Sequence, residues 1–116
     1  MTEQRYTIQI TALAEADLQG IRDYLVEHDA REAANKLIDA LMERAASLET
    51  FPLRGSIPAE AEAGGRLNVR QLVLPPYRLI YTVAGTMVTV QLIADGRRDL
   101  RALLQQRLLM PRAEDQ

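Results

Sequence analysis

Arginine is the side chain with the clearest capacity for chemistry in this sequence. Thirteen of the fourteen basic residues are arginines, and Lys36 is the one lysine. Residues 1–53 carry five basic and ten acidic side chains, whereas residues 54–112 carry nine basic and four acidic ones. Guanidinium groups bind carboxylates and phosphates through paired hydrogen bonds. The C-terminal half is therefore a basic module suited to bidentate contact with such anions.

Several other chemistries are excluded by composition. The chain has no cysteine, which excludes disulfides, thiolate zinc sites and cysteine nucleophiles, and its one histidine, His28, cannot form a histidine metal cluster. No apolar run approaches the roughly 18 residues that span a membrane, and the N-terminus has no signal-peptide pattern. We therefore expect a single cytoplasmic domain over residues 1–116, with no metal, cofactor or membrane partner.

The segment 75–98, PPYRLIYTVAGTMVTVQLIADGRR, organises the expected fold. Two alternating apolar runs, residues 77–83 and 88–93, flank Gly85 and predict a β-hairpin. An even-numbered loop places six apolar side chains on one face: Leu79, Tyr81, Val83, Val88, Val90 and Leu92. The opposite face then holds Arg78, Thr82, Thr89 and Gln91. We expect function on this polar face or at its rim, with Tyr81 in the core.

The N-terminal part predicts a strand followed by a helical hairpin. Residues 5–10 alternate as a first strand, and Thr11 caps a helix that ends near His28. Asp29 with Glu32 resembles a capping box and is expected to start a second helix. Because the two helices are so closely joined, they are expected to be antiparallel.

Toward the C-terminus the pattern predicts a loop, a strand and a third helix. Residues 51–65 are expected to be irregular and mobile, and residues 66–74 to form a strand with a bulge between Val69 and Leu72. Residues 99–109 predict a helix with four leucines inward: Leu100, Leu103, Leu104 and Leu108. The order β-α-α-β-β-β-α predicts an α+β fold, a four-stranded, mostly antiparallel sheet with the N-terminal helical hairpin packed on one face and a C-terminal helix.

Five motifs connect the chain to a known family. The motifs AEADLQGIRDYL, FPLRG, VRQL, PYRLIYTV and IADGRRDL follow the order and spacing of the RelE/ParE superfamily, toxins of bacterial type II toxin-antitoxin modules, and resemble ParE more closely. The resemblance implies that an antitoxin wraps across the chain. It also implies one of two targets, because RelE-like members cleave mRNA on the ribosome and ParE-like members poison DNA gyrase.

The ribonuclease branch requires residues that are only partly present. Cleavage by 2′-hydroxyl attack needs a base, an acid and cations for the charged phosphorane. For a RelE-like site the resemblance offers Arg70, Arg78, Arg98 and Asp95. Many family members carry a His at the position of Asp95, and RelE-like ribonucleases add strand lysines and a C-terminal Tyr or His that this chain lacks. An aspartate with a pKa of about 3.9 is a poor base and cannot be the acid, which disfavours catalysis.

The first interpretation is therefore a ParE-like toxin that binds DNA gyrase. Its expected target-binding residues are Arg97, Arg98, Arg101, Arg107, Leu109 and Met110. The alternatives are a RelE-like, ribosome-dependent mRNA endoribonuclease, or a chain without toxicity that meets operator DNA only through the antitoxin. Arg78 and Arg98 are equally open to structural pairing with Asp95 or Asp99. The unpaired edge of an open sheet also predicts a homodimer or a toxin-antitoxin hetero-oligomer.

Overall fold

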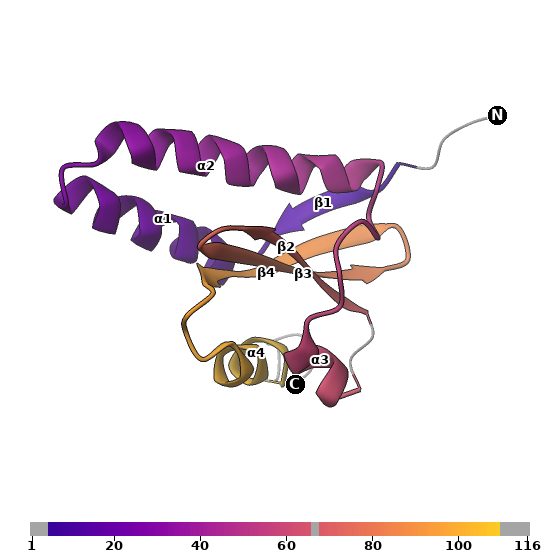
Figure 1. Cartoon of the computed structure of the whole chain (residues 1–116). Coiled ribbons are helices and arrows are strands. Elements are labelled where there is room, and N and C mark those ends of the chain that lie inside the picture. Colours follow the sequence, from indigo (N-terminus) through magenta and orange to yellow (C-terminus); the bar gives the residue numbers. More distant parts are fainter. Residues whose placement is uncertain (1–4, 66–67, 110–116) are drawn as a thin grey trace.

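A four-stranded sheet separates two layers of helices in the computed structural model, which describes residues 5–65 and 68–109 (Figure 1). The strands are β1 (Thr7–Ile10), β2 (Val69–Leu74), β3 (Tyr77–Ala84) and β4 (Met87–Asp95). They lie in the order β1-β4-β3-β2, with β1 parallel to β4 and the other neighbours antiparallel. This architecture confirms the predicted α+β fold.

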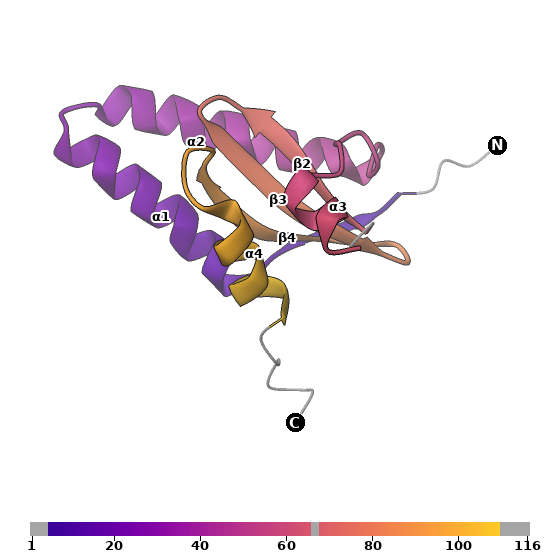
Figure 2. The ribbon, with the colours of Figure 1, turned by 60° about the horizontal axis from the view of Figure 1, so that its bottom comes forward.

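The helices divide between the two faces of the sheet. They are α1 (Ala12–Glu27), α2 (Arg31–Ala46), α3 (Ala59–Ala63) and α4 (Leu100–Leu109), with a single 3₁₀ turn η1 (Ser47–Glu49) after α2. The antiparallel pair α1 and α2 covers one face and projects beyond the sheet, whereas α3 and α4 lie on the other face (Figures 1 and 2). Among the described residues no helix has the length and apolar character that crossing a membrane requires.

The turn between α1 and α2 is built differently from the prediction. Thr11 caps α1 as expected, since its hydroxyl accepts a hydrogen bond from the Ala14 N–H at 3.1 Å. Asp29 does not cap α2: it lies in the left-handed region with φ of 60° and donates its N–H to the Val26 carbonyl. The next N–H, that of Ala30, reaches back to the Leu25 carbonyl, which completes a Schellman motif. Asp29 therefore ends α1, and α2 begins without a side-chain cap.

A β-bulge corrects the predicted register of the central hairpin. The pairing runs as expected from Val83 opposite Val88 to Tyr81 opposite Val90, and then Ile80 pairs with Leu92, so that Gln91 is the extra residue. Because one extra residue reverses the facing of every residue beyond it, Leu92 lies on the face opposite to the predicted one. The bulge expected between Val69 and Leu72 is absent, since β2 pairs with β3 in continuous register.

Each face of the sheet carries its own apolar core. Beneath α1 and α2 the buried residues include Leu41, Leu48, Leu79, Tyr81, Val88, Val90 and Ile93. Beneath α3 and α4 they are Ala61, Val69, Ile80, Leu92, Ala94, Leu100 and Leu104. The expectation of an open polar face was therefore wrong, because the bulge turns Leu92 and Ala94 toward α4. The inward stripe predicted for the third helix is confirmed, with Leu103 and Leu108 partly buried beside Leu100 and Leu104.

The segment 51–65 is more ordered than its composition predicted. It contains α3, and just before this helix Ser56 exchanges backbone hydrogen bonds with Gln71 on the outer edge of β2. Farther along the same edge, the Val73 carbonyl accepts a hydrogen bond from Arg44 at 3.5 Å. The β2 edge is thus partly closed, contrary to the expected unpaired edge. Gly55 makes this approach close, since a Cβ there would press on the Gln71 carbonyl and the Tyr81 hydroxyl.

We predict that Gly55→Ala destabilises the chain by about 1–3 kcal/mol, because the added methyl has no room and the Gly55 N–H is displaced from the Tyr81 hydroxyl, now 3.1 Å away. Gly64→Ala is the matched control, since a Cβ there meets nothing closer than 3.6 Å. Urea unfolding followed by circular dichroism gives both values. Equal midpoints for the two variants would contradict the close packing at Gly55.

Candidate functional site

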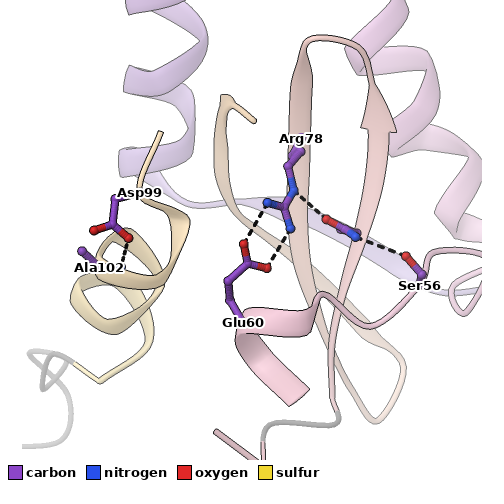
Figure 3. Close-up of polar contacts among 6 residues, drawn as sticks. Ser56, Glu60, Arg78, Asp99 and Ala102 are labelled. Carbon is purple, nitrogen blue, oxygen red and sulfur yellow. Dashed lines mark hydrogen bonds and ion pairs between the residues drawn. The ribbon is translucent and has the colours of Figure 1, made fainter. Parts of the chain in front are cut away.

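Arg78 is held by a carboxylate on α3 (Figure 3). Its Nη1 and Nη2 atoms each donate to one Glu60 carboxylate oxygen at 3.0 Å, and its Nε donates to Gln71 Oε1 at 2.7 Å. Gln71 Nε2 in turn donates to the Ser56 hydroxyl at 3.3 Å. The Arg78 and Glu60 side chains are only 16% and 27% exposed. Arg78 therefore joins α3 to the sheet, and its expected pairing with Asp95 or Asp99 was wrong.

The ion pair changes the electrostatics of both partners. Hydrogen bonds from Arg78 lower the pKa of the Glu60 carboxyl below its ordinary value of 4.5, although partial burial acts in the opposite direction. Glu60 is thus ionised at neutral pH and neutralises the Arg78 charge. A phosphate that approached this face would have to displace a bidentate carboxylate.

Arg107 was expected on the outer flank of the third helix, and the structure shows that this was wrong. Its Nη2 atom lies 2.8 Å from Asp17 Oδ1, and its Nη1 donates both to Asp17 Oδ2 at 3.0 Å and to the Gln91 carbonyl at 2.7 Å. Asp17 also accepts the Ile93 N–H at 3.0 Å. The Arg107 and Asp17 side chains are 13% and 15% exposed. This pair therefore joins α4, α1 and the bulged part of β4.

Three of the four residues considered for catalysis are engaged within the chain. Besides Arg78, Arg70 donates to the carbonyls of Leu53 and Gly55 at 3.2 and 2.7 Å. Asp95 accepts two side-chain hydrogen bonds from Arg97, which lower its pKa to about 2. A carboxylate with so low a pKa is an even weaker base than an ordinary aspartate.

The tyrosine expected in the core is there. Tyr81 is fully buried, and its hydroxyl accepts the Gly55 N–H at 3.1 Å. Burial raises its pKa above the ordinary value of 10.0, so the phenol stays protonated at neutral pH. Its position beneath the helical hairpin keeps it away from the Arg78 face.

The remaining arginines of the predicted surface lie at the rim of the molecule. The Arg97 side chain is 85% exposed despite its contact with Asp95. Arg98 and Arg101 are exposed, and neither forms an ion pair with another described residue. Asp99 caps α4 by accepting the Ala102 N–H at 3.1 Å (Figure 3). The side chain of Leu109 and the whole of Met110 lie outside the described part of the chain.

A groove opens beside this rim, and sequence reasoning did not foresee it. Its volume is about 610 Å³, and it lies between α1 and the ends of β3 and β4 that adjoin the Arg97–Arg98 turn. We call it the α1 groove; it is lined on the helix by Ala16, Gly20, Ile21 and Tyr24, and across from it by Ala94, Arg97 and Arg98. Within the described ranges no three His, Cys, Asp or Glu side chains gather as a metal site would require.

Sequence reasoning also missed the two carboxylates that hold the arginines. Glu60 and Asp17 lie 18 and 90 residues from their partners, and no local pattern connects them. One signal was available for the groove. A glycine inside a helical pattern, such as Gly20, lowers helix stability and often has a packing reason.

Comparisons with known proteins agree with this geometry. The family model of the ParE toxin of the type II toxin-antitoxin system parDE matches residues 8–100. A chain of the chromosomal ParDE TA system from P. aeruginosa is similar in structure, with a TM-score of 0.66, 25% identity, and coverage of 79% of this chain and 97% of that one. A chain of the toxin-antitoxin complex RelBE2 from Mycobacterium tuberculosis shares the fold, with a TM-score of 0.58, 22% identity, and coverage of 81% and 94%. No curated protein matches the chain.

We predict that Glu60→Gln lowers stability by roughly 1 kcal/mol at pH 7, since a partly exposed charged hydrogen bond is lost. In the wild type, the lowered pKa of Glu60 adds stability that is fully present above about pH 4.5 and disappears as the pH falls through the folded-state pKa. The variant should lose this part of the pH dependence. Glu62→Gln, on the same helix, is the control, and equal pH profiles for the Glu60 variant and the wild type would contradict the prediction.

Proposed function

We propose, since the chain belongs to the ParE toxin family of type II toxin-antitoxin systems, that it arrests growth by binding and poisoning DNA gyrase and is neutralised by a cognate antitoxin. The match over residues 8–100 is the observation that carries the proposal. The similar chain from P. aeruginosa belongs to a ParDE system, which supports an antitoxin as partner. We expect that antitoxin from the gene beside this one.

The arrangement of charges supports action by binding. A large protein target is usually gripped through exposed arginines and apolar anchors, and buried ion pairs contribute nothing to such contact. Arg98 and Arg101 are exposed at the start of α4, and Arg97 lies beside them. We therefore propose Arg97, Arg98 and Arg101 as the target-binding cluster, with Arg107 as a structural residue that holds their helix in place.

The same charges argue against mRNA cleavage as the activity. A phosphorane needs cations that are free to face it, and Glu60 already neutralises Arg78. Asp95 has a pKa of about 2 and is ionised in any cellular condition, so it can donate no proton. Ribosome-dependent cleavage would require a rearrangement that releases these residues from their partners.

We predict that Arg101→Glu abolishes growth arrest and DNA breakage while changing stability by about 0.5 kcal/mol or less, because the side chain is exposed and unpaired among the described residues. Arg31→Glu, an exposed reversal of the same charge at the start of α2, is the matched control and should stay toxic. Growth after induction, DNA breakage and thermal melting are measured for each variant.

Two further variants decide between the activities. Arg107→Glu should lose stability as well as toxicity, since it places a second carboxylate beside Asp17. Arg78→Ala should affect toxicity less than Arg101→Glu. Full toxicity of Arg101→Glu together with ribosome-dependent RNA cleavage that Arg78→Ala abolishes would overturn the proposal and establish the ribonuclease.

A further inference from the structure

We infer that the α1 groove is the docking site of one antitoxin segment, which places a bulky apolar side chain against Gly20 and a carboxylate on Arg98. The inference rests on the proposed function, since it names the place where the antitoxin acts. It also gives a mechanism, because a segment in this groove covers one of the arginines proposed to bind the target.

Gly20 is the first observation. It lies in the middle of α1, where glycine destabilises a helix relative to alanine. Nothing within the chain requires this glycine: the residue is exposed, and a Cβ built on it has no atom within 4 Å. The missing side chain instead widens the α1 groove, which Gly20 lines. Close approach of a partner explains a glycine that the isolated chain does not need.

The shape of the α1 groove is the second observation. Ala16 and Gly20 lie one turn apart on α1, and the small Ala94 lies among the residues across from them. Tyr24, one turn further, is 58% exposed and provides a ring against which an apolar side chain can pack. The volume of about 610 Å³ suits one segment of polypeptide rather than the face of a large folded protein.

Charge selects an acidic segment. Two arginines line one end of the groove, and Arg97 is already paired with Asp95. Arg98 has no ion pair within the described residues, so its guanidinium can accept a carboxylate from the occupant. Because Arg98 also belongs to the proposed target-binding cluster, the antitoxin and the target should compete for it.

The test fills the groove and measures antitoxin binding and neutralisation separately. Gly20→Leu should weaken binding of the purified antitoxin in calorimetry about tenfold to a hundredfold, since the new side chain occupies the apolar site. In cells the variant should remain toxic, and co-expressed antitoxin should no longer rescue growth. Gln19→Leu is the matched control: it adds the same side chain to an exposed position of α1 that does not line the groove, and it should be rescued like the wild type.

Arg98→Glu should lose both antitoxin affinity and toxicity, which distinguishes a shared residue from one that serves the antitoxin alone. Thermal melting checks the fold of each variant, and Gly20→Gln replaces Gly20→Leu in every assay if the leucine variant aggregates. Unchanged antitoxin affinity in the groove-filling variant would overturn the inference whether or not the chain is toxic. A wild-type chain that binds the antitoxin but arrests no growth would instead overturn the proposed function.

Discussion

The edge of β4 beyond Val90 is the place on which the rest of the structure depends. β1 stops pairing there, because Thr11 leaves the strand to cap α1. The backbone groups that a longer β1 would have bound are instead satisfied by side chains: the Ile93 N–H by Asp17 and the Gln91 carbonyl by Arg107. Leaving such groups unpaired in a largely buried place would cost several kcal/mol. One ion pair thus replaces a length of strand and holds α1, β4 and α4 together.

Identical side chains acquire different roles according to the carboxylates that reach them. Arg78 and Arg107 meet Glu60 and Asp17 in largely covered positions and become structural. Arg98 meets no carboxylate within the described chain and stays available to a partner. The basic character of the C-terminal half is therefore concentrated at one rim of the molecule, close to the α1 groove. Composition alone could not have located it.

Local patterns predicted the strands, the two long helices and the α4 stripe, because alternation and helical spacing are properties of neighbouring residues. They failed where one residue decides. The extra residue Gln91 moved Leu92 to the other face, and Asp29 ended one helix instead of starting the next. α3 has five residues, too few for a helical period to appear. The partners of the arginines come from distant elements, so the candidate site required the tertiary structure.

The parallel pairing of β1 with β4 has a consequence for the order of folding. Thr7 pairs with Met87, so nearly the whole described chain must be available before the first strand finds its neighbour. Contacts between such distant residues form late, since closing a long loop costs entropy that local contacts do not. The helical hairpin can form early, but its apolar stripe has no sheet to cover it until β3 and β4 are paired. A growing chain therefore passes through a stage that is sticky but harmless, in which chaperones and proteases act before any toxin exists.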